Sequence, residues 1–271
     1  MQRKLALVST LNKDYFLGFK VFLYSILQHN PNLDYDYIIF NEGDITQEDI
    51  TELRKIYSKI IIREIDTAFY SDCKFQAYRA WKINPAHRLE IFKLTEYDKI
   101  IFFDADMLCT GNIAELFTMS HDFAGVEHPM HDAGDIYNYG YFKKNKGFNG
   151  GLMVVDKKFL TEKTVNDLKK IISGYTWFGN QASLNIYFKD TVTYISNKYF
   201  LSTPFMNFKN IKESVIWHFV GDKKPWHGVP FDGKNIDVMH IKYNKHVLGS
   251  TAFHVLMKVQ SVYEKYLAKV L

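Results

Sequence analysis

Two acidic side chains stand directly after a run of apolar residues in the middle of the chain. Residues 100–103 read Ile-Ile-Phe-Phe, and Asp104, Ala105 and Asp106 follow them. An uninterrupted run of β-branched and aromatic residues is typical of a strand buried on both faces of an α/β sheet. Because open α/β sheets bind ligands at the carboxyl ends of their strands, we expect both carboxylates at a ligand site. Hard oxygen ligands there would suit a divalent cation and the phosphates that it carries.

The same acidic pattern occurs at a second place in a less favourable context. Asp34 and Asp36 flank Tyr35 and precede the apolar run of residues 37–40. They therefore adjoin the amino end of a predicted strand, away from the edge at which α/β sheets bind ligands. We do not expect this pair to bind metal.

A histidine and a glycine-rich segment are further candidates for the site. His218 lies in the apolar run of residues 215–221, where a lone histidine is usually a hydrogen-bonded core residue. Gly221 and Lys224 follow it at a spacing that would fold a loop over a phosphate group. The glycines of residues 147–151 lead into another apolar run and would permit close approach of a ligand or of a neighbouring segment.

The elements that must position these residues alternate between strands and helices. Strands are predicted at residues 5–8, 37–40, 60–62, 100–103, 123–126, 152–155, 192–195 and 215–221. Helices are predicted at residues 16–28, from Thr46, at 89–94 with Arg88 opening the helix, at 113–117 and 161–172, from Gly179, and at 251–271. Three strands alternating with two helices at the start of the chain are typical of a nucleotide-binding α/β half. Residues 67–85 and 127–146 are predicted loops, long enough to shape a binding site.

Composition limits the classes of protein to which the chain belongs. The 271 residues are 47% hydrophobic, enough for one large α/β domain. A net charge of +4 without a long basic block does not indicate a nucleic-acid partner. Two cysteines suggest neither a disulfide framework nor a thiolate metal site. The apolar stretches are too short for a signal peptide or a membrane span, so we expect a soluble, cytoplasmic protein.

Five segments of the chain, taken in order, together resemble a known family. They are residues 10–15, the pair Arg79 and Arg88, residues 103–106, residues 148–151 and residues 218–226. Their order and spacing are similar to those of glycosyltransferase family 8, close to its glycogenin branch. The resemblance implies a single GT-A domain of the Rossmann-like α/β class, with a mixed, mostly parallel central sheet flanked by helices. It also implies a retaining hexosyltransferase that uses a UDP-sugar, with UDP-glucose as the expected donor, and Mn²⁺, or Mg²⁺ in its place.

The resemblance assigns donor-binding roles to specific residues. Those expected near the uridine are Thr10, Leu11, Asn12 and Tyr15. Those expected to hold the metal are Asp104, Asp106 and His218, with Ala105 between the two carboxylates. Those expected at the rest of the donor are Arg79 and Arg88, Asn149 and Gly150 at the sugar, and Gly221 and Lys224 at the diphosphate. Arg88 stands where the family has a lysine, and Lys224 would also stabilise the departing UDP.

The chain departs from the family pattern beside the reacting sugar. Asn180 and Gln181 stand where the family often has Asp-Gln, and an amide cannot act as a nucleophile or carry a carboxylate's charge. This departure favours a front-face mechanism in which the leaving UDP helps to deprotonate the acceptor. Otherwise Asp132 or Asp135 supplies the missing acid, or the enzyme is weakened.

The sequence also leads to expectations about the domain limits, the partners and the competing functions of the protein. Residues 1–250 are expected to form the transferase domain, and residues 251–271 an amphipathic helix packed on that domain or in a homodimer interface. The acceptor, a carbohydrate or a protein, is not identified by the sequence, and residues 201–214 contain no tyrosine that would match glycogenin's self-glucosylated one. The alternatives are a non-catalytic UDP-sugar-binding protein of the same fold and a metal-dependent nucleotidyltransferase. The second alternative would need a triphosphate-binding loop near the first strand, which residues 9–15 lack.

Overall fold

The computed structural model describes residues 3–73, 84–128, 147–174, 180–202, 206, 209–220, 224–227 and 250–271. The chain forms two compact units, each assembled from three separate segments. The sheet unit consists of Met1–Lys13, Asp34–Asp104 and Glu115–Ser196. The helical unit consists of Asp14–Leu33, Ala105–Ala114 and Asn197–Leu271. The predicted division into residues 1–250 and 251–271 stays a prediction.

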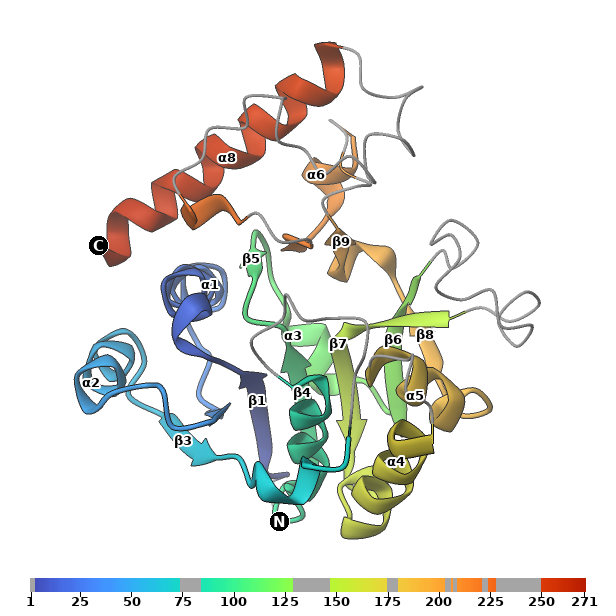
Figure 1. Ribbon diagram of the computed structural model, residues 1–271. Helices are drawn as coiled ribbons and strands as arrows, with labels where there is room; N and C mark the ends of the chain where they lie inside the picture. Colours follow the sequence, from blue (N-terminus) through green and yellow to red (C-terminus); the bar gives the residue numbers. More distant parts are fainter. Residues whose placement is uncertain are drawn as a thin grey trace. The chain divides into compact units, whose positions relative to one another are not determined.

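The sheet unit is built on a seven-stranded sheet with the order β3-β2-β1-β4-β7-β6-β8 (Figure 1). Its strands are β1 (Leu5–Thr10), β2 (Asp36–Asn41), β3 (Ile60–Glu64), β4 (Lys99–Phe103), β6 (Phe123–His128), β7 (Gly147–Asp156) and β8 (Thr193–Ile195). Pairing is parallel from β3 through β4 and between β6 and β8, while β7 runs antiparallel to both its neighbours. The predicted α/β class with a mixed, mostly parallel sheet is therefore confirmed.

The helices of the sheet unit begin at recognisable sequence signals. α2 (Gln47–Ile56) follows Thr46, whose side chain and that of Asp49 form a reciprocal capping box. The 3₁₀ helix η3 (Pro85–Lys93) begins after Asn84, whose side chain accepts a hydrogen bond from the Ala86 N–H. The predicted helix at 89–94 is therefore wrong in its bounds and type. Asn-Pro is a start signal, because proline favours the first helical position, and it places Arg88 inside η3 and not at its start.

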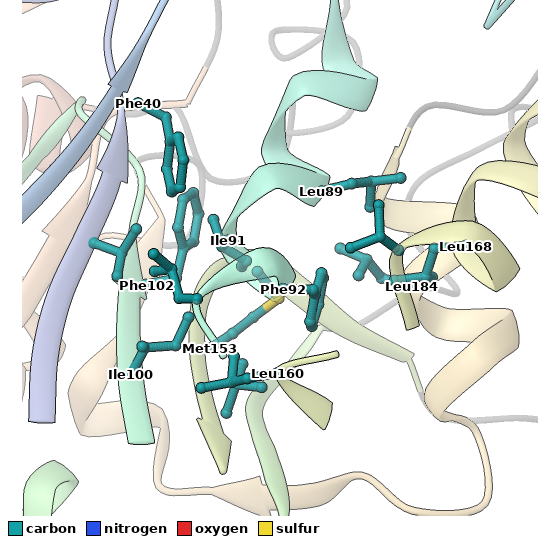
Figure 2. Close-up of a cluster of buried hydrophobic side chains, with 14 of the residues drawn as sticks. Phe40, Leu89, Ile91, Phe92, Ile100, Phe102, Met153, Leu160, Leu168 and Leu184 are labelled. Carbon is teal, nitrogen blue, oxygen red and sulfur yellow. The ribbon is translucent and has the colours of Figure 1, made fainter. Parts of the chain in front are cut away.

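The remaining helical elements of this unit are η2 (Ala68–Tyr70), α3 (Ala114–Thr118), η5 (Lys157–Phe159), α4 (Glu162–Gly174) and α5 (Asn180–Phe188). α4 contacts η3 and α5, and α5 also contacts β7. Figure 2 shows Leu89, Ile91 and Phe92 of η3 among side chains of the sheet and of α4 and α5. This apolar cluster fixes η3, and with it the backbone of Arg88, against the sheet.

The helical unit contains two long helices and a small sheet. Its elements are η1 (Lys13–Tyr15) at its first boundary, α1 (Phe16–His29), β5 (Met107–Cys109), η6 (Asn197–Tyr199), β9 (Leu201–Ser202), α6 (Asn210–Glu213), β10 (Ile216–His218), η8 (Pro225–His227) and α8 (Ser250–Val270). β10 pairs antiparallel with β5 and parallel with β9. α8 packs on α1 and on η8 (Figure 1). In the described part of the chain, no helix combines the length and the apolar character needed to cross a membrane.

Two sequence predictions about strands need correction. The strand predicted at residues 215–221 is shorter, because β10 ends at His218, where its pairing with β5 and β9 also ends. The glycines predicted to precede a strand lie inside one, since β7 already begins at Gly147. Residues 147–149 of β7 pair with β6 beyond a register shift between Gly125 and Val126. This pairing depends on a distant partner segment, so the local sequence pattern does not reveal it.

Candidate active site

Asp104 is positioned at the carboxyl end of β4, as the strand pattern predicts. β4 ends at Phe103, and the Asp104 N–H donates to the Gly151 carbonyl of β7 at 2.8 Å. On the neighbouring strand β1, the Ser9 hydroxyl donates to the Phe103 carbonyl at 2.8 Å. Ser9 thus has a structural role immediately before Asp104.

Arg88 reaches Asp104 from η3. Its Nη2 donates to Asp104 Oδ1 at 2.5 Å, with both side chains mostly buried. The guanidinium also lies over the Phe102 ring, 5.1 Å from the ring centroid. Ion pair and ring together hold the cation in one orientation beside the strand end.

Gly150 provides the space that Arg88 needs. A Cβ added at Gly150 would lie 2.9 Å from Arg88 Nη1 and 3.4 Å from Leu184 Cδ1, so any larger residue would displace the arginine. The Gly150 N–H donates to Gln181 Oε1 at 3.2 Å, and Asn149 Oδ1 accepts from the Gly151 N–H at 2.7 Å. The structure therefore brings together five predicted residues in the sheet unit: Arg88, Asp104, Asn149, Gly150 and Gln181.

Asn185 joins this group, although it is not among the residues predicted from the sequence. Its Oδ1 accepts from the Phe148 N–H at 2.8 Å, and its Nδ2 donates to the Phe148 carbonyl at 2.9 Å and to the Gln181 carbonyl at 2.8 Å. The buried amide thus ties α5 to β7. The available signal was its position four residues after Gln181, which places both on one helix face.

The predicted uridine segment follows β1. Thr10 is the last residue of the strand, and Leu11 and Asn12 are buried. The Leu11 N–H donates to the Phe40 carbonyl at 2.9 Å, and the Leu11 carbonyl accepts from Asn41 Nδ2 at 2.7 Å. The backbone of Leu11 is therefore fixed by contacts within the sheet unit.

Asp106 in the helical unit is surrounded by two basic side chains. His218 Nε2 lies 3.0 Å from Asp106 Oδ1, and Lys224 Nζ donates to Asp106 Oδ2 at 2.6 Å. Lys224 also donates to the Phe219 carbonyl at 2.6 Å, while the Phe219 N–H donates to the Asp106 carbonyl at 2.9 Å. The three side chains are almost fully buried, so this is a desolvated charge cluster.

The electrostatics of the cluster favour an ionised aspartate. Burial disfavours the charged carboxylate, but the charges of His218 and Lys224 and their hydrogen bonds outweigh burial. As a result the pKa of Asp106 lies below its usual range. The surroundings of Asp106 therefore favour its ionised form.

The same cluster fits a divalent cation. Adjacent ligands of an octahedral ion, each about 2.1 Å from the metal, lie about 3.0 Å apart. The 3.0 Å between Asp106 Oδ1 and His218 Nε2 matches that spacing. Oxygen and imidazole nitrogen together suit ions such as Mn²⁺.

The other predicted site residues are placed as follows. Ala105 is buried at the start of the middle segment of the helical unit. Tyr15 ends η1, and Lys224 Nζ lies 5.4 Å from the centroid of its ring. Asn180 is the first residue of α5. Arg79, Asp132, Asp135 and Gly221 lie outside the described residues.

The second Asp-x-Asp pair has structural partners. Asp36 Oδ2 accepts from the Tyr97 hydroxyl at 2.7 Å at the amino end of β2. Asp34 is largely exposed and pairs with Lys59 at 2.5 Å. Neither residue lies at the strand edge that carries Asp104.

Comparison with known proteins supports a common ancestry over most of the chain. Glycosyltransferase GlyF of Streptococcus pneumoniae is 26% identical over 237 residues, which cover 82% of this chain and 57% of GlyF. Glycogenin of Neurospora crassa is 24% identical over 228 residues, which cover 80% of this chain and 30% of glycogenin. The chain thus spans little more than half of the first relative's length and about a third of the second's.

A solved structure shares the fold. The structure of the galactosyltransferase LgtC in complex with donor and acceptor sugar analogues has a TM-score of 0.68 to this chain. It is 16% identical and covers 90% of this chain and 96% of its own, so the likeness confirms the GT-A fold. A family model described as glycosyl transferase family 8 matches residues 6–229. Since this match extends over most of the chain, the protein belongs to glycosyl transferase family 8.

Proposed function

We propose that this protein is a retaining glycosyltransferase that moves a hexose, with glucose as the expected sugar, from a UDP-sugar to an acceptor. The observation that carries the proposal is the buried cluster of Asp106, His218 and Lys224 in a chain of family 8. A carboxylate, an imidazole and an ammonium group in one desolvated place match the charges of a metal-bound diphosphate. The similarity to GlyF, a glycosyltransferase, and to LgtC, a galactosyltransferase, supports sugar transfer and leaves the sugar open.

The proposed metal ligands are Asp104, Asp106 and His218, and the proposed ion is Mn²⁺, with Mg²⁺ as the alternative. These residues offer two carboxylate oxygens and one imidazole nitrogen, and only Ala105 separates the aspartates along the chain. The imidazole is a softer donor than oxygen and favours Mn²⁺ over Ca²⁺. When bound, the ion would neutralise charge that develops on the diphosphate.

Lys224 is the proposed stabiliser of the leaving group. Breaking the bond between the sugar carbon and the β-phosphate oxygen leaves the electron pair on that oxygen, where a fixed positive charge is most effective. An ammonium group has three donors, and Lys224 uses two of them on Asp106 and on the Phe219 carbonyl. We assign the third donor of Lys224 to the β-phosphate of the leaving UDP. Gly221 is also proposed to contact the diphosphate.

The acceptor proton is proposed to leave with UDP. Asn180 and Gln181 bear no carboxylate, and Gln181 Oε1 accepts from the Gly150 N–H. We therefore assign Gln181 to positioning the sugar between Asn149, Gly150 and Arg88, with Asn180 beside it. The acceptor oxygen then bonds to the sugar carbon on the face from which phosphate departs, and its proton passes to the departing phosphate oxygen. The alternative is that the carboxylate of Asp132 or Asp135 accepts this proton.

The test measures UDP release from a panel of UDP-sugars, with and without Mn²⁺, together with any gain of mass on the protein. Metal-dependent release with at least one sugar is expected. Asp106→Ala and His218→Ala should each abolish it and should remove metal-dependent binding of UDP. Asp34→Ala is the matched control, since it alters the exposed Asp-x-Asp pair, and it should leave both measurements unchanged.

The outcomes separate the competing functions. Binding of UDP with Mn²⁺ and no release from any sugar would identify a non-catalytic UDP-sugar-binding protein. Release of pyrophosphate from a nucleoside triphosphate would identify a nucleotidyltransferase. Unchanged metal-dependent UDP binding in both alanine variants would show that the metal assignment is wrong.

A further inference from the structure

The short helix η8 sets the position of Lys224. Lys224 immediately precedes η8, and the turn is closed by two hydrogen bonds with His227: its N–H donates to the Lys224 carbonyl at 3.1 Å, and its Nδ1 accepts from the Lys224 N–H at 3.4 Å. The middle residue of η8 is Trp226. A displacement of the η8 backbone at Trp226 would therefore also displace Lys224, because these two hydrogen bonds join both ends of the turn.

Trp226 rests on a glycine of α1. A Cβ added at Gly18 would lie 2.5 Å from both Cη2 and Cζ3 of Trp226, well inside the 3.5–4.0 Å at which carbon atoms normally contact. Glycine weakens a helix relative to alanine, yet α1 carries it in a buried position. The space at Gly18 is therefore occupied by the indole.

Tyr15, the residue directly before α1, contacts both Trp226 and Lys224. Its ring meets Trp226 edge-on, with centroids 5.8 Å apart, and lies 5.4 Å from Lys224 Nζ. On another side, Gln260 Nε2 of α8 donates to the Pro225 carbonyl at 3.3 Å, and the Tyr263 ring lies 6.2 Å from that of Trp226. Residues from α1 and from α8 thus hold η8 together.

We propose that the contact between Gly18 and Trp226 positions Lys224 on Asp106, so that Gly18 and Trp226 are positioning residues for the leaving-group cation. This inference rests on the proposed function for the role of Lys224. The placement itself depends only on contacts within the helical unit. No other residue type at position 18 leaves the indole where it lies.

Gly18→Ala tests the proposal through two measurements. In the full-length protein, kcat/KM for UDP-sugar turnover should fall on the order of 10- to 100-fold, as expected for a misplaced catalytic group. Acylation of the Lys224 amine by a small amine-reactive ester, followed by mass spectrometry, should become on the order of tenfold faster as the buried amine loses its two partners. Adding Trp226→Phe removes the distal ring atoms that an alanine would meet, so the double variant should recover in both measurements relative to Gly18→Ala.

Matched controls distinguish positioning from general loss of structure. Gly174→Ala should change neither measurement, because a Cβ there meets nothing within 4 Å. Lys99 is the internal standard for acylation, since it is buried in the sheet unit. Faster acylation of both lysines in Gly18→Ala would mean unfolding and would overturn the proposal. Rates of Lys224 acylation and of turnover equal to those of the wild type in Gly18→Ala would also overturn it. So would a double variant that recovers in neither measurement. A wild-type protein that turns over no UDP-sugar would contradict the proposed function. The rate of Lys224 acylation in Gly18→Ala would still show whether the contact between Gly18 and Trp226 positions Lys224.

Discussion

Arg88 shows how one side chain of the site is fixed by contacts of three kinds. The ion pair with Asp104 sets the direction of the guanidinium, the Phe102 ring supports one of its faces, and the missing side chain of Gly150 gives it room. A lysine could share the ion pair, but it would lack the planar group that stacks on the ring. The neighbours of Arg88, above all the Phe102 ring, therefore suit an arginine at this position.

Gly150→Ala is expected to displace Arg88 from Asp104. The new methyl group would lie 2.9 Å from Arg88 Nη1, and the displaced guanidinium should lower kcat/KM about tenfold or more. Overpacking should reduce the free energy of unfolding by about 1–3 kcal/mol. Steady-state kinetics and urea unfolding measure the two effects, with Gly174→Ala as control. Unchanged kinetics in Gly150→Ala would show that the orientation of Arg88 is irrelevant to turnover.

At the scale of elements, the site residues are held by buried polar contacts between segments. In addition to the Asn185 contacts that tie α5 to β7, His87 Nδ1 lies 2.7 Å from Glu42 Oε1 and links η3 to the residue after β2. Each such contact leaves an unsatisfied buried group if one partner is removed. These contacts align η3, α5 and β7, the elements that carry Arg88, Gln181 and Gly150.

The capping box of α2 gives a pH-dependent prediction. Burial tends to raise the pKa of Asp49, but its hydrogen bonds to Lys13 and Thr46 outweigh burial and lower the pKa below its ordinary value of 3.8. A lowered pKa means that the stabilisation is complete above about pH 4 and is lost as the pH falls through the folded-state pKa. Asp49→Ala should therefore cost about 1 kcal/mol at pH 7.

Urea unfolding of the wild type and of Asp49→Ala at pH 7 and at pH 3 measures this difference. The gap between the two proteins should narrow at the lower pH, because the carboxylate of the unfolded wild type has the higher pKa and binds its proton first. Lys13 is half exposed, so most of the effect should come from the Thr46 contacts and should persist in salt. A gap of equal size at both pH values would contradict the prediction.

At the scale of the whole molecule, each compact unit is assembled from three segments of the chain. The change from one unit to the other between Asp104 and Ala105 falls inside the acidic motif itself. Asp106 and His218, which lie 3.0 Å apart, are 112 residues apart in sequence. Local pattern cannot report such a pairing.

Metal and nucleotide should stabilise the protein if the proposed site is correct. A ligand that binds only the folded state raises the free energy of unfolding by about 2.7 kcal/mol at a hundred times its Kd. Mn²⁺ with UDP should therefore raise Tm by several degrees, EDTA should reverse the shift, and His218→Ala should abolish it. A Tm that rises equally in His218→Ala would place the ligand elsewhere.

Features of this protein that depend on residues close together in the chain could be predicted from the sequence. Apolar runs predicted most strands, including the end of β4 at Phe103, directly before Asp104, because side-chain periodicity is a local property. Thr46 predicted the start of α2 because capping joins residues only three positions apart. The order along the chain of the segments that carry Asp104, Asp106, His218 and Lys224 indicated the family, and the match to the family model confirms it.

Which of these side chains contact one another could be learned only from the fold. Two strands of the small sheet, β5 and β9, were not predicted, because strands of three and two residues are too short to carry a pattern of their own. Three contacts join residues from distant segments of the chain. They are the ion pair of Lys224 with Asp106, the close approach of Arg88 to Gly150, and the packing of Trp226 on Gly18. Such contacts arise from packing in three dimensions, where burial and shape select partners that sequence separation conceals.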